Sequence, residues 1–141
     1  MKSAYIATAL ALFTAACASG QYGSFVNTPA VESAVIIDVV NKMQAEFPVA
    51  KTTFALNNIN PFGAQLDQAL REKGFATVPQ AGEGDAQALN YVLDKVYQDT
   101  YRVTIYVNQI PYARAYRQSQ DGSVAPAGSW TKMGVSNGKI H

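Results

Sequence analysis

Three alternating segments follow one another in the second half of the chain, and they restrict the fold more than any other feature. Residues 88–97 (ALNYVLDKVY), 101–108 (YRVTIYVN) and 112–118 (YARAYRQ) each alternate apolar and polar side chains. A period of two is typical of a β-strand with one buried face. The connections at 98–100 and 109–111 are tight, as in β-hairpins. We therefore predict an antiparallel meander.

A long amphipathic segment precedes these strands. Apolar side chains recur about every four residues over 31–47, and Ile37 is among those that widen the apolar stripe. Asp38 is among the charged residues that mark the wet side. Thr28 can cap the start and Pro48 ends the segment. The pattern predicts a broadly buried helix.

A second helix is bounded by its own signals. Asn60 is a favourable N-cap before Pro61 at the first helical position, and Gly74 supplies a left-handed stop. Short strands are expected on either side of this helix, over 51–56 and 75–78.

These elements together predict an α+β fold. We expect one small domain in which two helices pack on a mainly antiparallel sheet of about five strands. The segment VAPAGSWTKM, residues 124–133, is either a last edge strand or an extended tail. Residues 134–141 are expected to be disordered.

The N-terminus has the pattern of an export signal. Lys2 precedes an uncharged apolar stretch over 4–13, and small residues follow as far as Gly20. The stretch is too short for a stable membrane span, which takes about 20 apolar residues. An N-terminal core helix is the alternative interpretation, but the segment shows no amphipathic face.

Cys17 is the one cysteine of the chain, and its fate depends on where the signal is cut. A cut before Ser19 would discard it. A cut before Cys17 would fit the end of a bacterial lipobox, Ala-Ala-Cys, although Thr14 stands where Leu is usual. We expect this second cut, with lipid attached to Cys17, because a lone free thiol is unusual in an oxidising compartment. Ala18 after the cysteine resembles a signal for sorting to the outer membrane.

This interpretation divides the chain into four parts. Residues 1–16 are the lipoprotein signal peptide, and 17–30 are the lipidated N-terminus and a flexible tether rich in Gly and Ser. Residues 31–133 are the folded domain, and 134–141 are the tail.

The residue content limits the chemistry available to the chain. One cysteine allows neither an intramolecular disulfide nor a cysteine zinc site, and one histidine, His141, ends the chain. Lys2 is one of 11 basic residues, so removing the signal leaves ten against ten acidic residues. We expect no cofactor, no metal, no catalytic residues and no direct binding of nucleic acid.

Tyrosine and arginine are crowded together between residues 91 and 117. A stacking platform for nucleic acid, tyrosines on half-buried sheet faces and a protein-binding surface are the three interpretations. The candidate partner contacts are Tyr101, Arg102, Tyr112, Arg114, Tyr116, Arg117 and Trp130.

Several segments occur in one order that resembles a known family. They are FGAQLDQALREKGF, LNYVLDKV, YRVTIYV, YARAY and APAGSWTKM, which lie between residues 62 and 133, and the similarity as a whole spans roughly residues 31–133. Together with the Ala-Ala-Cys export segment they resemble the TrbH family of conjugal transfer proteins.

The resemblance implies a small structural lipoprotein of a conjugative type IV secretion system. It would belong to the outer-membrane core complex and contribute to mating-pair formation, with no enzymatic activity. Its partners would be other core-complex subunits and outer-membrane lipid, the latter through Cys17. A fold like the N-terminal domain of secretins would be expected. A periplasmic module that binds peptidoglycan or a small ligand remains the alternative.

Overall fold

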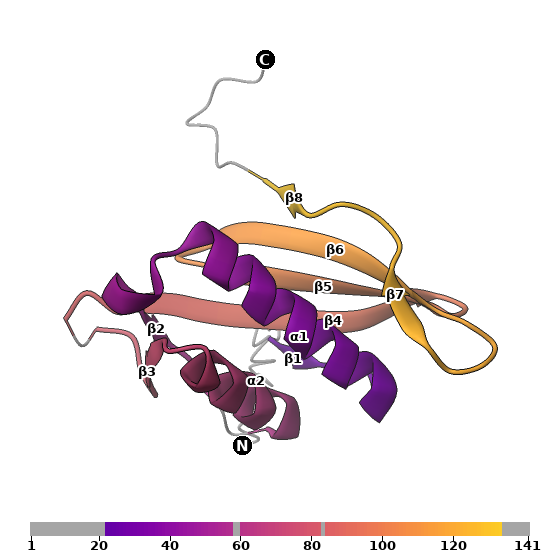
Figure 1. Ribbon diagram of the computed structural model, residues 1–141, viewed down its shortest axis with the longest axis horizontal. Helices are drawn as coiled ribbons and strands as arrows, with labels where there is room; N and C mark the ends of the chain where they lie inside the picture. The colour runs from indigo at the N-terminus through magenta and orange to yellow at the C-terminus, as the bar shows by residue number, and fades with distance from the viewer. Residues whose placement is uncertain (1–21, 58–59, 83, 134–141) are drawn as a thin grey trace, which may run out of the picture.

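The computed structural model describes residues 22–57, 60–82 and 84–133. Within these ranges the chain forms two α-helices, one short 3-10 helix and eight strands (Figure 1). In chain order they are β1 (Gly23–Ser24), α1 (Pro29–Glu46), η1 (Val49–Lys51), β2 (Thr53–Ala55), α2 (Pro61–Glu72), β3 (Ala76–Val78), β4 (Gln87–Tyr97), β5 (Thr100–Val107), β6 (Ile110–Gln118), β7 (Val124–Pro126) and β8 (Thr131–Lys132).

The strands make one open, mixed sheet in the order β3-β2-β4-β5-β6-β7. β4, β5 and β6 form the antiparallel meander that the alternation predicts. β2 runs parallel to both β3 and β4, while β1 pairs with β4 farther along the same edge and β8 pairs with β6. The α+β prediction is confirmed. The described residues hold more than the expected five strands because two- and three-residue strands flank the meander, and the likeness to secretin domains stays a prediction.

A tight turn sets the register of β5 and β6 within the meander. The turn between β5 and β6 places both Asn108 (φ 49°) and Gln109 (φ 70°) in the left-handed region. Positive φ at both central residues is the geometry of a type I′ hairpin turn, whose twist matches that of the paired strands. The pairing then runs without a slip from Val107–Ile110 to Thr100–Arg117.

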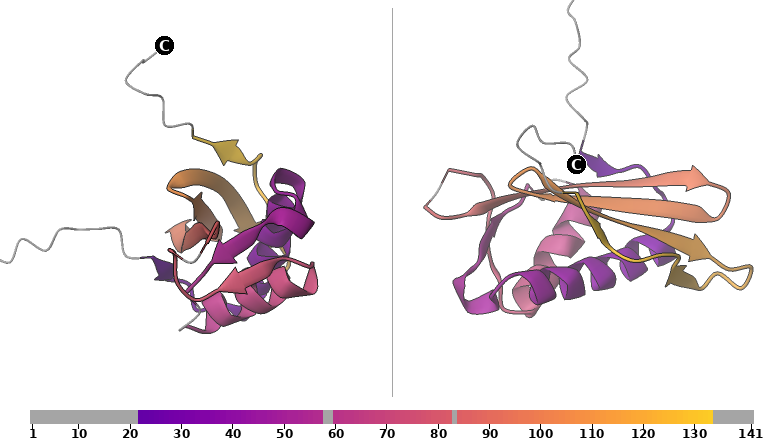
Figure 2. Two further views of the ribbon diagram at one scale, coloured as in Figure 1. Left: turned by 90° about the vertical axis from the view of Figure 1, so that its left-hand side faces the viewer. Right: turned by 90° about the horizontal axis from the view of Figure 1, so that it is seen from above.

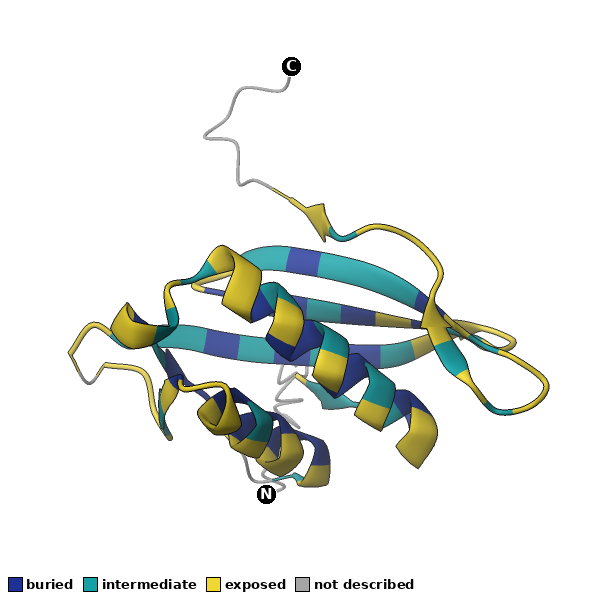
Figure 3. Ribbon diagram, viewed as in Figure 1, coloured by how far each residue is buried: buried dark blue, intermediate teal, exposed yellow. Residues whose placement is uncertain are grey.

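Both helices lie on one side of the sheet (Figure 2). The inward side chains of each strand alternate with outward ones, so that buried and less buried positions alternate along the central strands (Figure 3). The core is a single cluster between the two layers. Its fully buried members include Val35 and Val39 of α1, Leu66 of α2, and Leu93 and Ile105 of the sheet.

Helix α1 buries most of the expected apolar stripe but departs from the expected pattern at two positions. Ile37, expected to widen the buried stripe, is 64% exposed. Asp38, expected on the wet side, lies over the sheet and bonds to Arg114 and Tyr116 of β6. The prediction was wrong at both positions because it assigned faces by polarity alone. Thr28 is the N-cap residue, but its side chain makes no capping bond.

Helix α2 follows its sequence signals closely. The Asn60 side chain accepts a hydrogen bond from the Gly63 amide at 2.7 Å, so it is the predicted cap. Gly74 ends the helix with φ +99°. A Cβ at this position would come within 2.9 Å of a methyl group of Val49, so both conformation and space favour glycine.

The fold begins earlier than the expected boundary at residue 31. β1 lies within the stretch assigned to a tether, and the Phe25 amide also donates to Leu93 O at 2.8 Å. The expectations for the signal peptide, for Cys17 and for residues 134–141 fall outside the described residues. Among the residues described, no helix is long and apolar enough to cross a bilayer.

Candidate functional site

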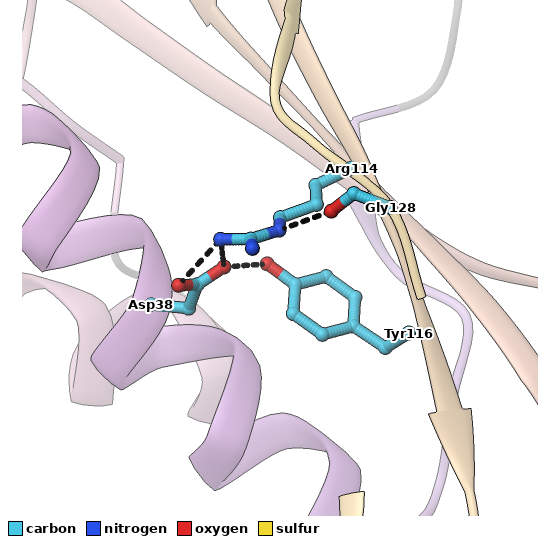
Figure 4. A network of polar contacts seen from close by, with 4 residues as sticks. All are labelled: Asp38, Arg114, Tyr116 and Gly128. Carbon is cyan, nitrogen blue, oxygen red and sulfur yellow. Dashed lines mark hydrogen bonds and ion pairs between the residues drawn. The ribbon is translucent and has the colours of Figure 1, made fainter. Parts of the chain in front are cut away.

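A polar network joins α1 to β6 across the edge of the core (Figure 4). Nη1 of Arg114 donates to both carboxylate oxygens of Asp38 at 3.0 Å, and the Tyr116 hydroxyl donates to Oδ2 at 2.6 Å. The Arg114 and Asp38 side chains are each 22% exposed. Charge-assisted bonds of this kind are stronger than neutral ones when they are partly shielded from water.

Arg114 also contacts residues 124–133, which we call the strap. Its Nε donates to the carbonyl oxygen of Gly128 at 2.8 Å, and its guanidinium lies 5.8 Å from the centre of the Trp130 ring. β7 and β8, the two strands of the strap, pair with the outer edge of β6. One arginine therefore connects a helix, a strand and the edge segment.

Tyr116 is held in its neutral form. Burial, together with the hydrogen bond to Asp38, raises the pKa of the Tyr116 hydroxyl far above its usual value. A neutral phenol can donate to the carboxylate, whereas a phenolate could not. Tyr116 is therefore a structural donor at neutral pH.

The structure separates the candidate contacts into three groups, of which Arg114 and Trp130 form the contact with the strap described above. Tyr101, Tyr112 and Tyr116 are buried in the core, so these three candidate contacts are not accessible to a partner in this fold. Their rings occupy inward positions of β5 and β6, where large aromatic side chains fill the space beneath α1. The interpretation of tyrosines on buried sheet faces fits these three.

Arg102 and Arg117 lie on the other side of the sheet, where both are exposed. We call this side the open face. It comprises the outward residues of the meander: Asn90, Val92, Asp94, Arg102, Thr104, Tyr106, Pro111, Ala113, Ala115 and Arg117. Arg102 donates to Asp94 Oδ2 at 2.8 Å, while Oδ1 of Asp94 is buried without a hydrogen-bond partner among the described residues. Short side chains at Ala113 and Ala115 leave a shallow hollow of about 240 Å³ beside the strap.

The chain enters the fold at the open face. The ring of Tyr22 packs edge-on against Tyr106, with 5.5 Å between ring centres. Ser24 of β1 points to the helices, because its hydroxyl donates to Glu32 of α1. The side chain of Phe25, the next residue, therefore points to the open face, and Gly23 occupies an outward position as well.

A small pocket lies where β1, β2 and β4 meet. It has a volume of about 170 Å³ and is lined by Tyr22, Leu56, Asn57, Asn60, Leu89, Asn90 and Tyr91. Oδ1 of Asn60 accepts a 2.6 Å bond from the Tyr91 hydroxyl, and burial raises the pKa of that hydroxyl. The residues described include no group of three His, Cys, Asp or Glu side chains that could hold a metal ion.

Two parts of this arrangement were not predicted from the sequence. Arg114 was a candidate contact, but its bond to Asp38 was not predicted because 76 residues separate them. Nor was it predicted that Tyr22 and Phe25 belong to the folded domain. A signal was present in the second case, since Phe25 is a large apolar residue in a segment otherwise rich in Gly and Ser.

The fold and these contacts define a class of protein, a small α+β domain with one face of its sheet left open by the helices. The family model described as conjugal transfer protein TrbH matches residues 19–134. The chain therefore belongs to the TrbH family of conjugal transfer proteins, as its sequence segments indicate. The search of curated proteins finds no match, and neither does the search of solved structures.

Proposed function

We propose that the chain is a structural, non-enzymatic lipoprotein of a conjugative type IV secretion system. Lipid on Cys17 would hold it to the periplasmic face of the outer membrane, where it contributes to mating-pair formation and to assembly of the DNA-transfer channel. The observation that carries the proposal is the family match over residues 19–134, since TrbH proteins are conjugal transfer proteins.

The domain suits a role that depends on position. Its polar side chains at the α1–β6 contact are engaged with one another, and they brace the strap along the sheet edge. The half-buried Trp130 of the strap remains accessible for contact with other subunits. Aromatic side chains contribute strongly at protein interfaces.

Radioactive palmitate labelling tests the anchor. We expect label in the wild-type protein and none in Cys17→Ser, with the variant released from the membrane fraction. Equal labelling of the two proteins, or no label in either, contradicts the anchor.

Affinity purification from donor cells tests the assembly. The wild-type protein should recover other subunits of the channel after mild detergent extraction. Recovery of the protein alone would count against the structural role.

The 170 Å³ pocket supports a second candidate, a periplasmic module that binds peptidoglycan or a small ligand. Its asparagine and tyrosine side chains could hydrogen-bond a sugar or an amide. Binding of peptidoglycan fragments to the wild type, and its loss in Asn90→Leu, would favour this candidate. The residues that line this pocket include tyrosines and asparagines but no arginine to pair with an anionic group.

A further inference from the structure

We propose that the open face is the membrane-facing side of the anchored domain, with α1 and α2 directed away from the lipid. This inference rests on the proposed function, because it assumes that Cys17 carries the lipid. It adds which surface of the domain meets the bilayer.

The first argument is the length of the tether. Only five residue steps separate Cys17 from Tyr22, because β1 and the Tyr22–Tyr106 contact take up most of the expected linker. Five residues span at most about 18 Å when fully extended. The domain is therefore held directly above the membrane surface.

The second argument is where the tether leaves the domain. Tyr22 packs on Tyr106 of the open face, and Gly23 pairs with Val92 near the middle of β4. Packed layers lie about 10 Å apart and a helix is about 10 Å wide, so the outer side of α1 and α2 lies about 15 Å behind the sheet. Passing around the sheet edge to that side would use up the whole tether. The short link therefore favours the open face toward the lipid.

The third argument is the chemistry of this face. Tyr22 is 52% exposed and Phe25 is 59% exposed, and Tyr97 at the far end of β4 is 73% exposed. Aromatic side chains with one apolar and one polar end are enriched at membrane interfaces. Arg102 and Arg117 can contact lipid phosphates. Asp94, the carboxylate among the outward residues of the meander, is already paired with Arg102.

Fluorescence quenching by a spin label at the membrane surface tests the orientation of the domain. The full-length lipidated protein is placed in vesicles of phosphatidylethanolamine and phosphatidylglycerol that contain a headgroup spin-labelled lipid. Thr104→Cys on the open face and Ser33→Cys on the exposed side of α1 carry the same fluorophore, and they form a matched pair of near-isosteric substitutions. We expect several-fold stronger quenching at position 104 than at position 33.

Three results would overturn the inference: equal quenching at the two sites, stronger quenching at position 33, or protection of position 104 by a second copy of the chain, detected as a crosslinked dimer. A third variant, Thr104→Cys with a flexible Gly-Ser insertion between Gly20 and Gln21, tests the tether. Weaker quenching at position 104 would support the tether as the cause, and unchanged quenching would support intrinsic affinity of this face for lipid.

Palmitate labelling of the same preparation distinguishes failure of the lipid anchor from failure of the orientation. A protein without lipid fails the anchor in the proposed function. A lipidated protein that shows no contrast between positions 104 and 33 fails only the orientation.

Discussion

Arg114 contributes to stability through several elements at once. Replacing it in Arg114→Met would leave Asp38 half-buried beside Tyr116 without its cation and would free Gly128 in the strap. Removing one partner of a shielded ion pair is costly because the other charge stays desolvated. We expect the free energy of unfolding to fall by about 2–3 kcal/mol. Urea unfolding of the mature chain with Cys17→Ser measures it.

Arg117→Met is the matched control for that substitution. It removes a guanidinium from the outward side of β6, where the side chain is exposed and makes no contact with Asp38. Its effect should stay within about 0.5 kcal/mol. Equal losses in the two variants would show that the Asp38 network adds nothing.

The raised pKa of Tyr116 leads us to predict a change in the free energy of unfolding at alkaline pH. Its pKa is raised in the fold, whereas the unfolded chain has the usual value near 10. The folded state therefore retains the proton, and this contribution to stability is complete below pH 10 and is lost as the pH rises above it. In Tyr116→Phe the free energy of unfolding should fall less steeply between about pH 10 and 12 than in the wild type. An unchanged slope would contradict the assignment.

At this scale, polarity alone did not predict which side chains face the sheet. Ile37 and Asp38 are neighbours on α1, and the apolar one is exposed while the charged one lies over the core. The sequence of the helix contains no sign of this, because the reason is Arg114 and Tyr116 on a strand far along the chain. The cap at Asn60 was predictable because its partner, Gly63, is only three residues away.

The β5–β6 hairpin offers a test at the scale of elements. Gln109 has φ 70°, a conformation that costs a residue with a Cβ roughly 1 kcal/mol or more. Gln109→Gly should therefore raise the free energy of unfolding by about 0.5–1 kcal/mol, allowing for the added freedom of the unfolded chain. Thermal unfolding measures this. Gln120→Gly, at a position without positive φ, should give no gain, and a similar gain there would contradict the explanation.

The start of α2 offers a second test. Oδ1 of Asn60 accepts bonds from the Gly63 amide and the Tyr91 hydroxyl, so Asn60→Ala loses the cap and leaves a mostly buried hydroxyl unpaired. The loss should be about 2 kcal/mol by chemical denaturation. Asn60→Asp keeps both acceptor contacts and should stay close to the wild type. A similar loss in Asn60→Asp would mean that the amide group itself matters.

Elements with strong local signals were predicted with their pairing, whereas for the short strands formed by distant pairing at most their existence was predicted. The meander and α2 follow from alternation, a cap, and tight turns within the segments themselves. β1 has two residues, too few for a periodic pattern, and forms because β4 presents an unpaired edge to it, so its residues were expected to belong to the tether. β7 and β8 pair with the edge of β6 and lie in the segment 124–133, for which an edge strand was one of two expectations.

At the scale of the whole molecule, the proposed role combines a family, an anchor and an orientation. Membership in the TrbH family gives the conjugal transfer role. The early start of the fold at β1 shortens the link to Cys17, which would keep the domain beside the membrane. The exposed sides of α1 and α2 would then face away from the lipid. In this proposal the protein contributes by positioning its surfaces in the assembly. The polar contacts at the α1–β6 junction stabilise the domain.

The frequency of DNA transfer from donor to recipient cells tests the central claim most directly. A donor that lacks this protein should transfer poorly, and the wild-type chain should restore transfer. Cys17→Ser should be exported and folded yet leave transfer near the level of the deletion, because the domain is no longer held at the membrane. Normal transfer by the deletion donor, or full restoration by Cys17→Ser, would contradict the account.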